Sequence, residues 1–525
     1  MKRILPFAAL CIGFAFDFLF WKKPLGISWA IFLIFSILIG FSLLRAKKIS
    51  PAGKNFFLFI SIIFFSVMSF LRKEPLTTFL NIGLSIFSTI VLVMTYSSGL
   101  WSTFNLRDYG ANLFQLVASM VVHPQDQSIS AGFQPSSPKS TQKRKTCLSV
   151  FRGILLALPI LFIFAVLLSS ADLVFAQKLD SFFANFQLEN IGEYLFRGSY
   201  ILLIAYFFVG LIRHVMLRSQ QDKRASLGDP LVKRFLGFTE TSIVLGSVIA
   251  LFSVFVVIQF QYLFFGQSNI SLSGFTYSEY ARRGFGELVA VAVFSLLLLQ
   301  SLSAITKRET KQQKKIFSGL ITGLVITVLV ILVSAFQRLL LYESAYGFSQ
   351  LRTYAHVFML WLGILLAAVV IFEILERPRF VTNLALAVLI GFTATLNCMN
   401  VDAFIAHQNV KRAVQGEGLD VAYLASLTDD AIPGLVRIYS STETSSAIRD
   451  EVGVALVCHI ALKEMDNSQI KPWQSFHLST WRADQAVAKI QKNLAGYHIR
   501  EESWQIFVTT PNGLEYSCRE PALFD

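Results

Sequence analysis

Eight charged residues at or near the ends of apolar stretches could form one polar site. Glu279, Arg283 and Glu287 are spaced four apart, so they share one face if that stretch is helical. The remaining members come from other parts of the chain: Asp172, Arg282, Arg338, Glu343 and Arg352. Such a group could bind an anionic ligand or a lipid headgroup. It could equally be a salt-bridged cap that locks helix ends together, which is the interpretation we favour.

The composition places these residues in an integral membrane protein. Hydrophobic residues make up 54% of the 525-residue chain and charged residues only 15%, whereas soluble domains carry about 25% charged residues. Phe alone contributes 50 residues, and Phe inserts favourably into lipid. The formal net charge is +13, and the basic residues lie between the apolar runs. Orientation of the chain in the membrane explains this charge better than nucleic-acid binding does.

The apolar runs predict about eleven transmembrane helices, because a bilayer core of about 30 Å needs about 20 apolar residues. The predicted segments are Ile4–Phe20, Leu25–Leu44, Asn55–Leu71, Leu76–Tyr96, Leu148–Leu168, Leu195–Ile212, Thr241–Phe264, Phe285–Ile305, Ile316–Ala335, Ala355–Phe372 and Phe380–Cys398. The fold class is therefore an all-α integral membrane protein. Asp17 in the first segment and Glu240 at the start of the seventh are isolated acids, too few for a proton relay through the membrane.

Loop charges predict the orientation. With the N-terminus in the cytoplasm, the cytoplasmic connections hold 25 Lys and Arg residues and the opposite loops hold 10. Cytoplasmic loops carry the excess of basic residues, so we expect the N-terminus inside. An odd number of spans then places the C-terminal tail outside the cytoplasm.

The chain divides into five predicted parts. Residues 1–98 form a four-helix membrane part, and residues 147–398 form a seven-helix membrane core. Residues 99–122 contain an amphipathic helix on the membrane surface, for which a short twelfth span is the alternative. Residues 123–146, rich in Pro, Ser, Gln and Lys, form a flexible cytoplasmic linker. Residues 399–525 form a small, mostly helical extracytoplasmic domain that ends in a β-hairpin turning at Pro511-Asn512-Gly513.

Two features of the tail could carry chemistry. Asp429 and Asp430 precede a helix that is expected to begin near Ile432, so we interpret them as an N-cap, with cation binding as the alternative. Cys458 and Cys518 both lie in a compartment that would permit a disulfide, but sequence spacing leaves their pairing open. The five cysteines include no Cys-x-x-Cys pair and the histidines no His-Glu-x-x-His, so we expect no metal and no cofactor.

Several short stretches resemble a bacterial family of multi-pass membrane proteins, domain of unknown function 4173 (DUF4173). The most specific is Tyr280-Ala-Arg-Arg-Gly-Phe285, within Thr276–Leu288. Supporting stretches are Ser169–Asp172, Phe336–Gly347, Trp361, Asp402–Ala406, Leu427–Pro433 and Trp473–Phe476. The resemblance implies the membrane class, and it implies no catalytic residue because the family has no agreed activity.

Three functions remain open. The first is a non-enzymatic scaffold, a sensing protein or an envelope-assembly component, with membrane lipids and other envelope proteins as partners. The second is a transporter or lipid-handling protein that uses the outer polar cluster. The third is a membrane-embedded enzyme acting on a lipid. The sequence contains no Gly-x-Ser-x-Gly elbow, phosphate loop or dinucleotide fingerprint, which disfavours an enzyme.

Overall fold

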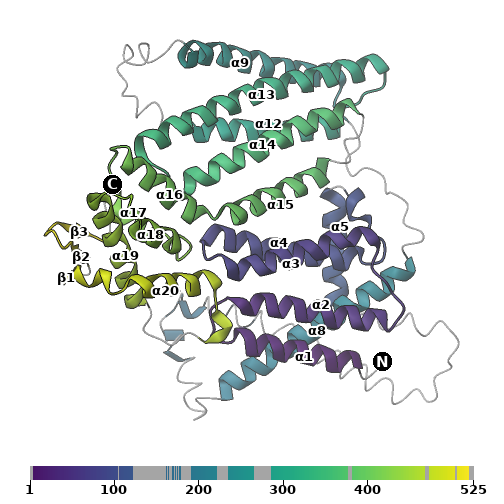
Figure 1. Ribbon diagram of the computed structural model, residues 1–525. Coiled ribbons are helices and arrows are strands. Elements are labelled where there is room, and N and C mark those ends of the chain that lie inside the picture. The colour runs from purple at the N-terminus through teal and green to yellow at the C-terminus, as the bar shows by residue number, and fades with distance from the viewer. Residues whose placement is uncertain are drawn as a thin grey trace. The chain divides into compact units, whose positions relative to one another are not determined.

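The computed structural model describes residues 4–104, 106–121, 191–221, 235–264, 285–375, 381–466, 472–502 and 505–518, with a few single residues between 161 and 178. The chain separates into two compact units. The first contains residues 1–56, 89–99 and 110–225, and the second contains residues 57–88, 100–109 and 226–525. Each unit is built from long helices (Figure 1).

The first unit is centred on three apolar helices, α1 (Ile4–Phe20), α2 (Ile27–Arg45) and α8 (Ile191–Gln221), of which α2 and α8 are candidate membrane spans. Helix α1 packs against both α2 and α8. The α1–α8 crossing is close at Gly13, where a Cβ would lie 2.4 Å from the carbonyl oxygen of Ile201. Only glycine allows this approach of the two backbones.

The second unit contains most of the remaining helices. Its membrane helices are α3 (Phe56–Leu71), the first part of α4 (Pro75–Thr95), α9 (Phe238–Phe264), α12 (Phe285–Ile305), α13 (Lys311–Tyr346), α14 (Gln350–Ile374) and α15 (Val381–Met399). Helix α13 packs against α9, α12 and α14, and α14 packs against α15. Trp361 of α14 lies over Gly391 of α15, where a Cβ would come within 2.1 Å of the ring.

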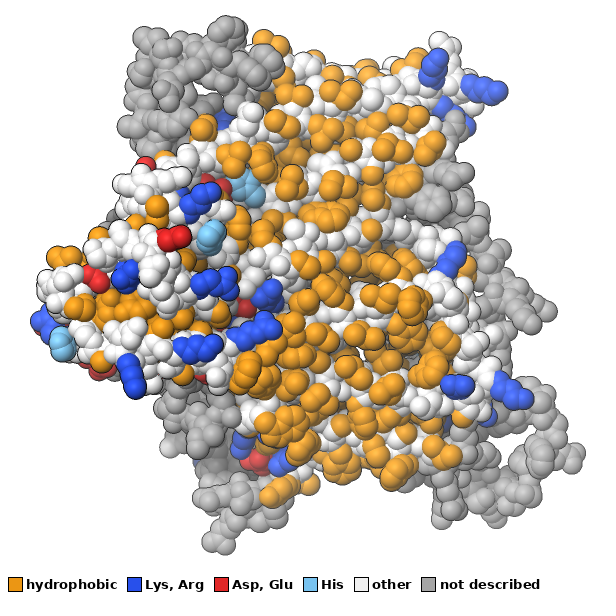
Figure 2. All heavy atoms as spheres, viewed as in Figure 1, with side chains coloured by type: hydrophobic (Ala, Val, Ile, Leu, Met, Phe, Trp, Pro, Cys, Tyr) orange, Lys and Arg blue, Asp and Glu red, His pale blue; other side chains and the backbone are white. Residues whose placement is uncertain are grey.

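Nine helices among the described residues are long and apolar enough to cross a membrane. Figure 2 shows hydrophobic side chains spread over the helix flanks, with Lys and Arg near helix ends and on the C-terminal part. The count of eleven is not confirmed. Ile4–Phe20 forms the expected helix, α1, but has only 17 residues, and most of Leu148–Leu168 lies outside the described residues. A helix α5 (Leu106–Val121) forms where an amphipathic surface helix is expected.

The C-terminal domain, residues 401–518, follows α15 directly. Its elements are α16 (Val401–Val414), α17 (Val421–Ser426), α18 (Ile432–Tyr439), α19 (Ser446–Asp466), the 3-10 turns Trp473–Ser475 and Asn493–Gly496, α20 (Leu478–Ile490), β1 (His498–Glu502), β2 (Gln505–Thr509) and β3 (Glu515–Ser517). The strands form an antiparallel sheet in the order β1-β2-β3. The expected hairpin is β2–β3, and Gly513 in its turn has a positive φ of 83°.

The core of this domain continues into the membrane helices. Buried Leu424, Leu435 and Leu456 belong to the same hydrophobic cluster as Val357 of α14 and Leu396 of α15. The break between the two parts is a single residue, Asn400, whose φ of 54° ends α15 and starts α16 in a new direction. Because one core serves both parts, the domain is packed on the helix ends and does not hang from a linker.

Candidate functional site

The predicted outer cluster is only partly described. Glu279, Arg282 and Arg283 lie outside the described residues. Glu287 is exposed in the first turn of α12. Asp172 is also exposed, and its Oδ1 accepts hydrogen bonds from the backbone N–H groups of Val174 (2.7 Å) and Phe175 (3.1 Å).

The other members contact groups of the protein. Arg338 is buried, and its Nη2 donates to Gln259 Oε1 of α9 at 2.6 Å. Glu343 is 1% exposed and lies 3.1 Å from His356 Nδ1. Arg352 donates to the backbone carbonyl of Gly347 and covers the ring of Tyr342. Contacts of this kind tie neighbouring helices together, and the role of the cluster as a cap stays a prediction.

A denser polar site lies where the α3–α4 turn meets the C-terminal domain. We define the junction cluster as Arg72, Lys73, Glu74, Asp429 and Asp430. Lys73 Nζ lies 2.8 Å from Asp429 Oδ2, and the Lys73 backbone N–H donates to Asp430 Oδ2 at 2.8 Å. Arg72 Nη1 lies 3.4 Å from Asp430 Oδ1. Two basic residues between two spans thus meet two acids of the tail.

The N-cap interpretation of the two aspartates is wrong. Helix α18 has Ala431 at its N-cap and no side-chain hydrogen bond there, while Pro433 lies in its first turn as expected. An Asp that acts as a cap bonds to the helix that directly follows it. Here the two carboxylates bond instead to basic residues that are remote in sequence. The positive charges that pair with Asp429 and Asp430 belong to the side chains of Lys73 and Arg72.

Asp429 gathers three more partners from the C-terminal domain. Its Oδ1 lies 3.1 Å from His459 Nε2 and 3.6 Å from Lys463 Nζ, and its Oδ2 accepts from Thr480 Oγ1 at 2.6 Å. Burial acts to raise the pKa of Asp429, but the hydrogen bonds from His459, Lys73 and Thr480 outweigh it and hold this pKa well below its ordinary value. The carboxylate is therefore ionised and fully bonded.

Asp430 behaves in the opposite way. It is buried, and desolvation raises its pKa above the ordinary value, although the Lys73 backbone N–H and Arg72 act against the rise. The Arg72 guanidinium also bonds to a membrane helix, because its Nε donates to the backbone carbonyl of Asn397 in α15 at 3.0 Å. Asp430 is the more weakly compensated acid of the pair.

Glu74 joins the turn to two helices. Its carboxylate accepts from the backbone N–H groups of Leu76 (2.8 Å) and Thr77 (2.7 Å), which caps the start of α4. The hydroxyl of Tyr354 in α14 donates to the same carboxylate. Below the turn, Asn81 and Asn397 exchange amide hydrogen bonds of 2.9 and 2.8 Å and tie α4 to α15.

A second set of contacts holds the α13–α14 turn to the domain. Asn409 of α16 accepts from the Phe348 N–H at 2.7 Å and donates to the Phe348 carbonyl at 2.9 Å. Arg412 donates to the carbonyl of Ser344 at 2.8 Å. Gly347 has a φ of 80°, and a Cβ there would lie 2.7 Å from the Arg412 guanidinium, so the turn needs glycine at this position.

A third contact runs through Asp402 of α16, which is fully buried. Its Oδ1 accepts from Gln350 Nε2 at 2.7 Å, and its Oδ2 accepts from the N–H (2.9 Å) and hydroxyl (2.6 Å) of Thr428. Asp402 thereby links the start of α14 to the loop before Asp429. With the junction cluster and the α13–α14 turn, the domain is held at three places.

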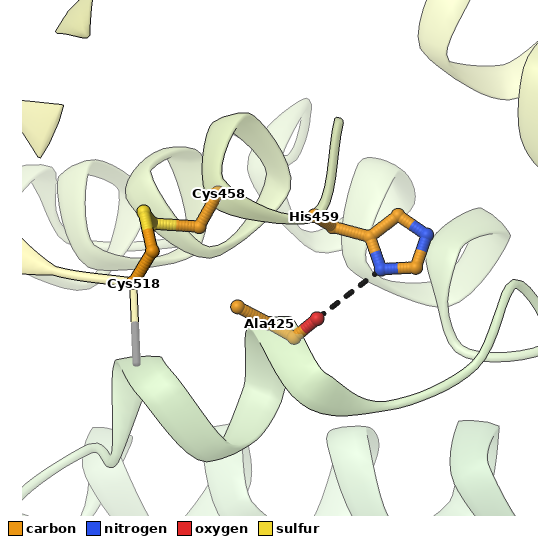
Figure 3. Close-up of a disulfide and its surroundings, with 4 residues drawn as sticks. All are labelled: Ala425, Cys458, His459 and Cys518. Atoms are coloured by element: carbon orange, nitrogen blue, oxygen red, sulfur yellow. Dashed lines mark hydrogen bonds between the residues drawn. A yellow bond between two sulfur atoms is a disulfide. The ribbon is translucent and has the colours of Figure 1, made fainter. Parts of the chain in front are cut away.

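The domain is also cross-linked internally. A disulfide joins Cys458 of α19 to Cys518 after β3, with Cα atoms 5.2 Å apart. Figure 3 shows the neighbouring His459 pointing away from the disulfide, towards the carbonyl of Ala425. That carbonyl and the Asp429 carboxylate both accept hydrogen bonds, so the ring donates to both only when both its nitrogens carry protons. His459 therefore links α19, α17 and the junction cluster.

The first unit has its own polar cluster at one end of α1. Arg197 of α8 donates to Asp17 through Nε (2.9 Å) and Nη2 (2.6 Å). Glu193 accepts from the indole of Trp21 (2.7 Å) and from Lys22 Nζ (2.6 Å). The isolated acid in the first predicted span is thus one half of a bidentate ion pair.

Sequence reasoning missed the junction cluster, although its components are visible in the chain. Arg72 and Lys73 are counted there only among the ten basic residues of the opposite loops, and Asp429-Asp430 are interpreted as a cap, with cation binding as the alternative. The available signal is a basic pair in a very short turn and an acidic pair in a tail on the same side of the membrane. No group of three His, Cys, Asp or Glu side chains that could hold a metal occurs among the residues that the structure describes.

Comparison with known proteins gives one match. The model of a family described as "Domain of unknown function (DUF4153)" matches residues 59–438. No curated protein and no solved structure matches the chain. The prediction of a family of unknown function is confirmed at that level, but the family is DUF4153 and not DUF4173. Most large apolar residues can replace one another in a membrane span. The few polar motifs of such a chain therefore indicate a multi-pass membrane protein more reliably than they identify its family.

Proposed function

The chain belongs to the DUF4153 family, and on that premise we propose that it is a membrane-embedded scaffold that holds its C-terminal domain fixed outside the cytoplasm. The observation that carries the proposal is the set of three contacts between domain and helix ends. In each one the polar groups bond to one another, as a permanent attachment requires. A transporter or an enzyme instead needs polar groups that are available to a substrate.

Two features support the extracytoplasmic placement. The loop charges favour a cytoplasmic N-terminus. The α3–α4 turn, the α13–α14 turn and the domain, which that orientation puts on one side, meet at one end of the second unit. The Cys458–Cys518 disulfide suits an oxidising compartment. The bacterial cell membrane and other envelope proteins as partners belong to the same proposal.

The remaining parts of the chain take supporting roles in this scaffold. Helix α5 lies on the cytoplasmic surface, and the linker expected in residues 123–146 lies outside the described residues. Arg338, Glu343 and Arg352 of the predicted outer cluster act as a structural cap of the helix ends in the second unit. The chain needs no cofactor for this role.

Topology and attachment can be tested together in cells. A reporter fused after Asp525 should be active only outside the cytoplasm, and one inserted within residues 123–146 only inside. In a deletion strain with an envelope phenotype, Asp429→Ala should restore growth as poorly as a chain truncated after Met399, because both lose the fixed domain. Full rescue by the truncated chain would reject the scaffold and favour a transporter built from the helices alone.

A further inference from the structure

Three aromatic side chains on one short segment of the C-terminal domain are exposed. Trp473 is 55% exposed, Phe476 is 37% exposed and Trp481 is 51% exposed. Three residues between them, Gln474, Ser475 and Ser479, are buried. Fully burying a large apolar side chain is favourable by about 1.5–3 kcal/mol, so three neighbouring exposed ones indicate a surface that meets something less polar than water.

Helix α20 shows that Trp481 points away from the domain core. Ser479, Ala483 and Ile490 are the buried residues of this helix. Each helical residue turns by about 100°, so Trp481 lies about 200° from both Ser479 and Ala483. Arg482 next to it is exposed as well. The outer face of α20 thus begins with an indole beside a guanidinium.

The contacts of the neighbouring residue place this face near the membrane. Thr480 donates to Asp429 Oδ2 at 2.6 Å, and the same oxygen lies 2.8 Å from Lys73 Nζ. Lys73 belongs to the turn between α3 and α4, which are both candidate spans. The candidate spans on either side of this turn are Gly53–Leu71 with 19 residues and Pro75–Thr95 with 21 residues. These lengths cover about the 30 Å of the hydrocarbon core, so the turn lies at the headgroup level. Trp481 directly follows Thr480, which is connected to this turn through Asp429.

We propose that the segment Trp473–Arg482 lies in the headgroup layer of the membrane that α3 and α4 cross, and binds anionic phospholipid headgroups there. Trp prefers this layer because its ring is apolar and its N–H is polar. The exposed Arg482 supplies positive charge for the phosphates. The partner is the lipid surface and not another protein, because the junction cluster fixes the depth of the segment. The inference holds on either side of the membrane.

The position of Trp481 relative to lipid can be measured in the full chain. The protein is labelled with 5-fluorotryptophan and placed in nanodiscs of phosphatidylcholine, with or without phosphatidylglycerol. Fluorine NMR then follows the Trp481 resonance, which Trp481→Phe identifies. A lipid with a spin label on its headgroup broadens resonances in the headgroup layer, and an aqueous gadolinium chelate broadens those in water. Leu514→Trp, at an exposed position in the β2–β3 turn, is the control in the same domain.

The headgroup label should broaden Trp481 several-fold more than the indole of Leu514→Trp, and the chelate should do the reverse. The effect on Trp481 should increase with phosphatidylglycerol, and Arg482→Gln should remove that increase. Equal responses of Trp481 and the control, or broadening of Trp481 by the chelate alone, would overturn the proposal. An effect independent of phosphatidylglycerol would reject the anionic headgroup as the ligand. None of these outcomes depends on reporter topology, so they are separable from a failure of the scaffold function.

Discussion

In the first unit, Asp17 and Arg197 join the apolar helices α1 and α8 through one bidentate pair. In the second unit, Asp429 meets Lys73, His459, Lys463 and Thr480 at one carboxylate. The first pair fixes the position of one helix against another. The second collects groups from the α3–α4 turn, α19 and α20, so its loss affects every element it gathers. The Asp17–Arg197 pair therefore fixes only the two helices that carry it, whereas the junction cluster holds several elements of the C-terminal domain in place.

Asp429→Ala should have the largest effect on stability. It leaves three basic groups beside one another without their carboxylate, and breaking a buried ion pair costs about 4 kcal/mol. Hydrogen exchange of α18 and α19 in detergent would measure the loss as faster exchange of their backbone amides. Glu464→Ala, which removes an exposed acid from α19, is the matched control and should change little. A loss below about 1 kcal/mol for Asp429→Ala would contradict a shared anchor.

Reduction of the Cys458–Cys518 disulfide should come next, at about 3 kcal/mol, because the bond closes a loop with a sequence separation of 60. The effect should be confined to the C-terminal domain, since both cysteines lie there. Thermal unfolding with and without reductant, compared with the Cys458→Ala/Cys518→Ala variant, measures it. Equal destabilisation of α1 and α8 would show that the units are not independent in stability.

Asp17→Asn should cost about 2 kcal/mol, because it replaces charged hydrogen bonds to Arg197 by neutral ones. Faster exchange should appear in α1 and α8, while α18 and α19 stay unchanged and act as the internal control. If the domain loosens as much as the helix pair does, the comparison between a local and an integrating cluster fails.

The smallest expected effect distinguishes the two adjacent aspartates by pH. The pKa of Asp429 is lowered from the ordinary 3.8, so its stabilising contribution is present above pH 3.8 and is lost as the pH falls towards its folded pKa. The pKa of Asp430 is raised, so its contribution is present below pH 3.8 and is lost as the pH rises through its folded pKa.

Asp429→Asn should therefore destabilise the domain most above pH 3.8 and less at lower pH. Asp430→Asn should improve relative to wild type as the pH rises, by about 1 kcal/mol for each unit of pKa shift. Unfolding curves of both variants across this range provide the measurement. Parallel pH profiles for the two variants would mean that the carboxylates share one environment.

The sequence predicts the membrane part better than the junction, for a physical reason. Bilayer thickness sets the length of an apolar run, and the bounds Phe285–Ile305 are those of α12. The hairpin at Pro511–Gly513 is equally local and also forms. Arg72 and Asp430, by contrast, are 358 residues apart in sequence. Local preferences cannot distinguish an aspartate that caps its own helix from one that meets a distant arginine.

The most direct test of the account is the distance between domain and helices in the intact chain. Spin labels at Phe79→Cys in α4 and Asp484→Cys in α20, both exposed positions, report it by pulsed electron resonance in nanodiscs. The background has Cys11, Cys147 and Cys398 replaced by Ser. The account predicts one narrow distance distribution that broadens in Asp429→Ala and is unchanged in Glu464→Ala. A broad or two-peaked distribution in the unmutated junction, or one that Asp429→Ala leaves unchanged, would contradict the claim that the junction cluster fixes the domain.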